Sequence, residues 1–150
     1  MDQETSKYIL ITPPAAIYDN TSPGVTEIDC KDWDELEIVV ALGASDIAVA
    51  ACKVTESDTA GSGHTDVTGL VFGTSTNTDG STSTLPSATD DNKLFGFHID
   101  LRKRKRYIDM VLTAGDGTSG TFITVWARLS RGKSVPNTAA TRGFSQVLRV

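Results

Sequence analysis

The chain has 150 residues, of which 39% are hydrophobic and 22% charged, and its formal net charge is −5. This length and composition predict one globular domain with a hydrophobic core and exclude wholesale disorder. No apolar run approaches the roughly 20 residues of a membrane-spanning helix. The acidic start of the chain lacks the pattern of a secretory signal, so we expect synthesis in a cytosol.

Residues 1–30 contain prolines at positions 13, 14 and 23, which interrupt regular structure. Only short strand candidates lie around them, and these are residues 8–12, 15–19 and 25–29. We therefore expect residues 1–30 to form an extended N-terminal arm or edge segment. The remaining residues, 31–150, are predicted to form a single domain.

Strict alternation of apolar and polar side chains, the pattern of a half-buried strand, occurs four times in this domain. The four segments are residues 35–42, 94–101, 107–114 and 121–129. Residues 45–57 combine alanine-rich helical character with strand-forming Ile and Val, and we interpret them as a strand. Weaker strand candidates lie at residues 68–72 and 145–150, and the polar residues 73–92 are predicted to form a long surface loop. Several strands without a long helix predict an all-β fold, an antiparallel β-sandwich or jelly-roll-like domain.

The formal charge is unevenly distributed along the chain. Residues 1–92 contain 16 acidic and three basic side chains, a net −13, whereas residues 93–150 contain three acidic and 11 basic ones, a net +8. Strands of opposite charge can interleave in the fold and cancel this asymmetry. They can also leave two oppositely charged surfaces that favour association with neighbours. The sequence leaves both outcomes open.

Five consecutive cations separate two of the strongly predicted strands. They are Arg102, Lys103, Arg104, Lys105 and Arg106. The flanking alternation predicts a hairpin whose connection carries the charge, and neighbouring side chains of such a connection point in opposite directions. Nucleic-acid binding is disfavoured, because the chain is acidic and contains no recognition-helix pattern. The remaining interpretations are a loop that contacts an acidic protein surface and a loop that is merely solvated.

The sequence contains no recognisable catalytic motif. Its two histidines, His64 and His98, form no recognised set with a nucleophile, and no phosphate-binding glycine loop is present. Cys30 and Cys52 lie in no CxxC motif or Cys/His cluster, and we expect small buried thiols whose pairing stays open. We therefore expect no enzyme, no cofactor, no metal site and no small-molecule substrate.

Large aromatic side chains mark a candidate contact surface. Phe122 and Trp126 share one face of the strand at residues 121–129 with Arg128, opposite its aliphatic face. Exposed aromatic residues beside an arginine are typical of protein interfaces. The alternative is that a loop or arm of the same chain covers them. Trp33, in an acidic stretch, is a second candidate anchor with the same alternative.

Three stretches of the chain resemble the capsid decoration (cement) proteins of tailed bacteriophages. They are VVALGASDIAVAACKVTESD (39–58), LPSATDDNKLFGFHIDLRKRKRYIDMVLTAGDGTSGTFITVWARLSR (85–131) and RGFSQVLRV (142–150). The resemblance is one of overall pattern and spans residues 35–150.

This resemblance implies a structural virion protein without catalysis. Proteins of the family are generally β-rich, assemble as trimers, and bind the outer surface of the expanded capsid, where they tie neighbouring major capsid subunits together. The implied partners are the major capsid protein and further copies of the chain, with no membrane involved. The implied location is the outer capsid surface, after assembly in the host cytoplasm. Residues 102–106 would then contact acidic groups on the capsid or on the next protomer.

Two other classes of protein stay open. One is another phage structural component with a β-sandwich, such as a tail or neck part, which the copy number per particle distinguishes. The other is a carbohydrate- or nucleic-acid-binding module, which the retention of glycan or DNA on purification distinguishes.

Overall fold

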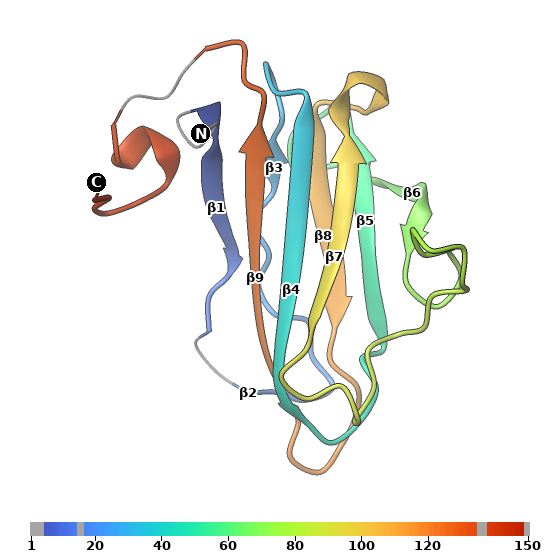
Figure 1. The fold of residues 1–150 in the computed structure, drawn as a ribbon. Helices are drawn as coiled ribbons and strands as arrows, with labels where there is room; N and C mark the ends of the chain where they lie inside the picture. Colours follow the sequence, from blue (N-terminus) through green and yellow to red (C-terminus); the bar gives the residue numbers. More distant parts are fainter. Residues whose placement is uncertain (1–4, 15–16, 135–137, 149–150) are drawn as a thin grey trace.

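Two antiparallel β-sheets pack face to face in the structure, a computed structural model that describes residues 5–14, 17–134 and 138–148 (Figure 1). The predicted all-β fold is confirmed. The elements are β1 (Lys7–Thr12), β2 (Ile17–Tyr18), β3 (Ile28–Asp29), β4 (Glu35–Ser45), β5 (Ala51–Ser57), β6 (Thr65–Val71), β7 (Leu94–Asp100), the 3-10 helix η2 (Leu101–Lys103), β8 (Tyr107–Thr113), β9 (Thr121–Ser130) and the 3-10 helix η3 (Ala140–Arg142).

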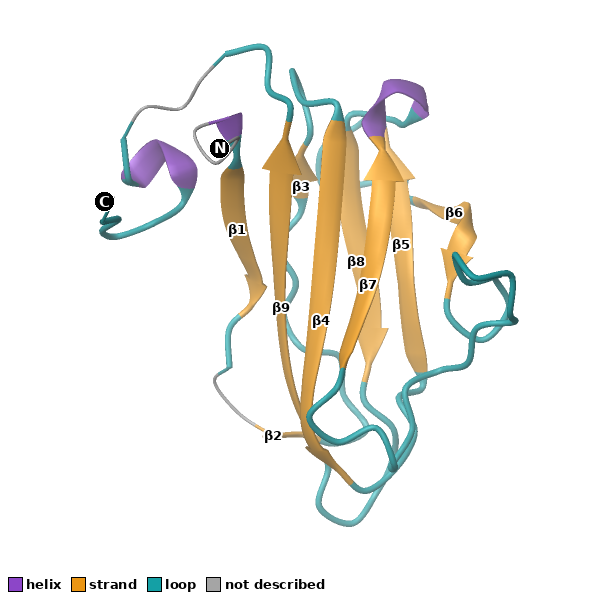
Figure 2. Ribbon diagram, viewed as in Figure 1, coloured by secondary structure: helices purple, strands orange, loops and turns teal. Residues whose placement is uncertain are grey.

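The strand order is that of a jelly roll. The first sheet runs β1-β9-β4-β7, with the short β2 paired to β9, and the second runs β3-β8-β5-β6. Figure 2 shows the first sheet in front of the second. Strands that are consecutive in the sequence mostly lie in opposite sheets, which is the double-sheet arrangement of a jelly roll.

The hydrophobic core lies between the sheets and comes from the alternation of the strands. On β4, Leu36, Ile38, Val40 and Leu42 are each at most 4% exposed, and the residues between them face outward. β7, β8 and β9 supply the core in the same way. Because side chains alternate across a strand, each long strand buries one face and presents the other to the surroundings.

The predicted hairpin around residues 102–106 is wrong. β7 belongs to the first sheet and β8 to the second, so the basic segment crosses from one sheet to the other through η2. The Asp100 side chain caps this turn by accepting the N–H of Arg102. Alternation indicates which face of a strand is buried but not which strand lies beside it. Here β7 pairs with β4, and β8 pairs with β5.

The N-terminal segment contributes strands to both sheets. β1 forms an edge of the first sheet by pairing with β9, and β3 pairs with β8 in the second. Ile11 and Thr12 of β1 are buried, at 2% and 0% exposure. Within one chain these residues therefore form a sheet edge that covers part of the core.

The strand candidate at residues 145–150 is not a strand over its described part, residues 145–148. Just before it, Gly143 takes a left-handed conformation with φ 85°. A side chain at this glycine would collide with the backbone carbonyl of Tyr8, so the chain passes β1 at close range. The Phe144 ring then packs against the Tyr8 ring, with 4.9 Å between ring centroids and an angle of 49° between the ring planes. The chain turns at β1 instead of pairing with it.

The two cysteines are free thiols, and the fold keeps them apart. The Cys30 N–H bonds to the carbonyl of Arg106, whereas Cys52 pairs with Leu112. Arg106 directly precedes β8 and Leu112 lies within it, so about 20 Å of extended chain separates the two partners. The Cα atoms of bridged cysteines lie within about 7 Å of each other. No disulfide can join them in this fold. Burial raises the pKa of both thiols to about 12.

Candidate binding surface

The outer face of the first sheet carries most of the aromatic residues that the sequence singled out. The core-facing residues of β9 are Ile123, Val125, Ala127 and Leu129, all buried. Phe122, Trp126 and Arg128 therefore face away from the core, as their alternation predicted. Phe122 is 49% exposed, whereas Trp126 and Arg128 are half-buried.

One half of this outer face is apolar, and we call it the outer apolar patch. Its members are Leu10, Ile17, Val39, Ala41, Leu94, Phe122 and Trp126. The strand register places them side by side: Leu10 pairs with Trp126, Trp126 with Val39, Ala41 with Leu94, and Ile17 with Phe122. Leu10, Ile17, Leu94 and Phe122 are 56%, 49%, 66% and 49% exposed. At roughly 100 Å² each, these four side chains alone present on the order of 400 Å² of apolar surface.

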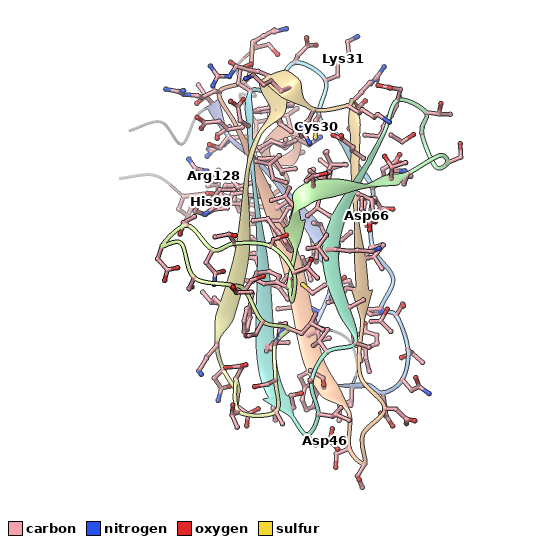
Figure 3. The ribbon with its side chains drawn as sticks, turned by 90° about the vertical axis from the view of Figure 1, so that its right-hand side faces the viewer. Cys30, Lys31, Asp46, Asp66, His98 and Arg128 are labelled. Atoms are coloured by element: carbon pink, nitrogen blue, oxygen red, sulfur yellow. The ribbon has the colours of Figure 1, made fainter. Side chains whose placement is uncertain are left out.

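The other half of the same face is ionic. Glu37 lies between Arg128 and His98 in the strand register, and its carboxylate is 3.3 Å from His98 Nε2. Arg128 donates two hydrogen bonds to Ser6 Oγ, at 3.2 and 3.1 Å. One row further along, Glu35 pairs with Arg131 at 3.1 Å. Figure 3 shows His98 and Arg128 at the same height of the sandwich. The outer face thus joins an apolar surface to a largely self-paired polar one.

The three arginines of the basic segment bind carboxylates of the same chain. Arg106 forms two hydrogen bonds with Asp29, at 2.8 and 2.6 Å, and its cation lowers the pKa of that carboxyl group. Arg102 does the same with Asp100, at 2.8 and 2.6 Å, and lowers the pKa of Asp100 to about 2. Arg104 lies 3.5 Å from Glu56.

These pairs show that part of the charge asymmetry cancels within the fold. Asp29, Asp32, Glu35 and Glu56 belong to the acidic part of the chain and each pairs with a cation from the basic part. The opposite charges therefore interleave across the crossover between the sheets. The carboxylates that the arginines of the basic segment contact therefore belong to the same chain.

Lys103 and Lys105 differ from the arginines around them. No side-chain ion pair involves either lysine within the part of the chain that the structure describes. The backbone N–H of Lys105 donates to Glu56 at 3.1 Å, which fixes the segment without using the ammonium group. Of the five residues of the basic segment, these two keep their charge available to a partner.

Trp33 does not join the outer apolar patch. It lies in the turn before β4, half-buried against the core, and its ring packs so closely on Gly132 that a side chain there would collide with it. Of the two alternatives for Trp33, the structure shows that other parts of the same chain cover its side chain. Leu10, Ile17 and Leu94 were not singled out in the sequence, because only the pairing of distant strands brings them onto the sheet face that carries Phe122 and Trp126.

Several other polar side chains hold loops in place. Glu27 accepts from Gly61 N–H at 2.9 Å and lies 2.7 Å from His64 Nε2. Asp46 accepts the N–H groups of Thr118, Ser119 and Gly120, which lowers its pKa. Residues 5–14, 17–134 and 138–148 contain no group of three or more His, Cys, Asp or Glu side chains placed to hold a metal ion. The described part of the chain also holds no helix with the length and apolarity needed to cross a membrane.

Comparison with known proteins adds one similar structure. No family model matches the chain, and no curated protein matches it. The crystal structure of the SPBc2 prophage-derived protein YomS is similar, with a TM-score of 0.48 and 16% sequence identity over 83% of this chain and 91% of that one. No inference about function or assembly follows from a similarity of this size.

Proposed function

We propose that the protein is a capsid decoration protein of a tailed bacteriophage, which binds the outer surface of the assembled shell and links neighbouring major capsid subunits. Its partners are the major capsid protein and further copies of itself, in a homotrimer as in the family that the sequence resembles. Binding is the whole of its activity, and the proposal includes no reaction, cofactor, metal or small-molecule substrate.

The outer apolar patch is the observation that carries the proposal. Its exposed members together reach the size of the largest apolar patch on a typical monomer, about 300–600 Å², and such patches are often functional. The patch lies on an open sheet face, whose hollow between Ala41, Gly43 and Phe122 is open to the surroundings. An open face of this kind suits a broad protein surface, whereas a small ligand requires a site that encloses it. The resemblance of residues 35–150 to decoration proteins supplies the class of partner. The jelly roll agrees, since viral capsid domains use it, but a fold alone implies no function.

The mechanism is thermodynamic. A protein that binds the expanded shell and not its dissociated subunits stabilises the shell by mass action. Each copy needs only modest affinity, because a multimer that touches several subunits at once binds with an avidity far above that of one contact. In this arrangement the patch supplies apolar contact, while Lys103 and Lys105 contact acidic groups on the shell.

The pairing of the basic segment supports protein binding over nucleic-acid binding. Arg102, Arg104 and Arg106 are held by carboxylates, so a phosphate backbone would have to displace those partners. We expect the double variant Lys103→Glu/Lys105→Glu to fold normally and to bind shells more weakly, with altered salt dependence. Undiminished binding of this variant at moderate salt would show that the two lysines do not contact the shell.

The decisive experiment mixes the purified protein with expanded, undecorated phage capsids, pellets the capsids, and measures the copies bound by gel densitometry. Saturation at a stoichiometric ratio to the major capsid protein, together with delayed thermal disruption of the shell, is the expected result. Absence of co-pelleting would overturn the proposal. A handful of copies per particle would instead indicate a tail or neck component, and glycan or DNA retained by the purified protein would indicate a binding module of another kind.

A further inference from the structure

The outer edge of β7 is the least protected strand edge of the sandwich. Sheet edges expose backbone groups that pair readily with another strand, and folded proteins usually cover, shorten or distort them. At the opposite edge of the first sheet, β1 is distorted by a register shift after Leu10 and is approached closely by Gly143. In the second sheet, the edge strand β3 is two residues long and β6 pairs irregularly with β5. By contrast, β7 is seven residues long and pairs regularly with β4 alone.

The hydrogen bonds of β7 show which of its backbone groups point outward. Leu42 N–H bonds to the Lys93 carbonyl, and Leu101 N–H bonds to the Asp34 carbonyl. Because antiparallel pairing alternates, Phe95, Phe97 and Ile99 also direct their N–H and C=O groups toward β4. Leu94, Gly96 and His98 direct theirs away from the sheet, and no described residue bonds to them.

A cavity lies along this free edge. It has a volume of about 310 Å³ and is lined by Gly96, Phe97 and His98 on the β7 side. β6 and the start of the long loop supply the opposite wall, at residues 69–72 and 75–78. An added strand would therefore find backbone partners on β7 and space for its side chains beside them, which is the geometry of peptide recognition by strand addition.

The chain itself contains a strand-like segment without a partner. Residues 145–150, SQVLRV, have the composition of a strand, yet residues 145–148 form no backbone hydrogen bond within the described part of the chain. Val147 is 46% exposed and Leu148 is 96% exposed. This segment leaves the molecule beside β1, on the side of the first sheet opposite β7 (Figure 1).

We propose that residues 145–148 of one copy add as a strand to the free edge of β7 in a second copy. The added strand continues the first sheet from one molecule into the next, because it starts at the β1 side of its own sheet and ends at the β7 side of its neighbour's. The contact is heterologous, so repeated use of it closes a ring or extends a chain of copies.

The charges of the two surfaces are complementary. Residues 138–150 contain two basic and no acidic side chains. The long loop at residues 73–92, which walls the cavity, contains three acidic and no basic ones, and of these Asp90 is paired with Lys93 at 2.8 Å. Opposite charge on the segment and on the loop orients the incoming chain and disfavours pairing of two β7 edges with each other. A second copy of this chain therefore fits the edge better than a β7-to-β7 dimer.

The first test measures the mass of the purified full chain by size-exclusion chromatography with light scattering over a range of concentrations. Gly96→Pro removes an outward N–H without touching the β4 ladder, and Gly96→Ala is its control, since the added Cβ would lie an ordinary 3.6 Å from the Ile38 carbonyl. Leu148→Asp places a charge in the added strand, with Val111→Asp, on the outer face of the second sheet, as its control.

We expect the wild-type chain and both controls to associate. Gly96→Pro should associate about tenfold more weakly, and Leu148→Asp between about tenfold and a hundredfold more weakly. Leu148 is almost fully exposed in the single chain, so its substitution leaves the fold intact. A wild-type chain that stays monomeric, or an oligomer that survives either test variant, would overturn the proposal.

A cross-linking test reports the contact directly. Val147→Cys protein is mixed, under oxidising conditions, with protein carrying Leu94→Cys, Gly96→Cys or His98→Cys, three positions on one face of β7. One register of the added strand should give a rapid disulfide between the two variants. The native cysteines do not compete, because they are buried. The absence of a cross-link at all three positions would contradict strand addition.

This inference concerns self-association in the absence of a capsid and does not depend on capsid binding. Failure of the association tests leaves the capsid experiment untouched, and failure of capsid binding leaves the strand contact intact.

Discussion

Substitution of Phe122 by serine tests whether the outer apolar patch is the capsid contact. Phe122 is 49% exposed in the isolated chain, beside Ile17 of β2. The exposed half of this side chain, roughly 100 Å², becomes buried if the shell covers the patch. At about 25 cal/mol per Å², this burial contributes about 2.5 kcal/mol to binding at each site.

That free energy corresponds to a change of about 70-fold in the dissociation constant. Part of it is offset by ordering of side chains at the interface, so we expect binding to weaken by at least about tenfold. The assay is a co-sedimentation isotherm with expanded capsids, in which the free concentration of protein at half-saturation is compared between variants. The fold itself should lose only about 1 kcal/mol, because half of the side chain is already in water.

Val111→Ser is the matched control. Val111 is an exposed apolar residue, at 36%, but it lies on the outer face of the second sheet. We expect this variant to bind like the wild type. If Phe122→Ser binds undiminished while Val111→Ser is weakened, the second sheet faces the shell and the argument from the patch is wrong. If neither variant changes binding, no apolar sheet face makes the contact.

Three further predictions concern the fold. Ile38→Ala, at a fully buried position of β4, should lower the free energy of unfolding in denaturant by about 2–5 kcal/mol, and a smaller loss would mean that the core collapses around the gap. The carboxyl groups of Asp29 and Asp100 have pKa values below the unfolded value of 3.8, and that of Asp100 is about 2. The ion pairs therefore stabilise the fold fully above pH 3.8, and this stabilisation is lost as the pH falls toward the folded pKa. The melting temperature should drop below about pH 4, and an unchanged melting temperature would contradict these pairs. Cys30 and Cys52 should react with a thiol reagent only after unfolding, and the melting temperature should not depend on reductant, because the thiols are buried and unbridged.

The sequence predicted the strands and their buried faces. Alternation at residues 35–42, 107–114 and 121–129 identified β4, β8 and β9. Successive side chains of a strand point to opposite faces, so the position of a residue along the strand determines which face it occupies. The same alternation placed Phe122 and Trp126 on the face away from the core. Two segments were exceptions. The strand predicted at residues 45–57 begins only at Ala51, because residues 46–50 connect β4 in one sheet to β5 in the other. Residues 145–148 form no strand, since strand composition produces a strand only where a neighbouring edge is available.

Only the tertiary structure decided which strands are neighbours. The basic segment resembles a hairpin loop in the sequence, but β7 and β8 pair in different sheets, and Arg106 meets Asp29 across 77 residues of chain. The outer apolar patch depends on the same long-range pairing, because Leu10 and Trp126 are adjacent only through the β1–β9 register. Local sequence determines how each strand divides its side chains between core and surface, whereas the surface that a partner meets is assembled from strands that only the packing of the two sheets brings together.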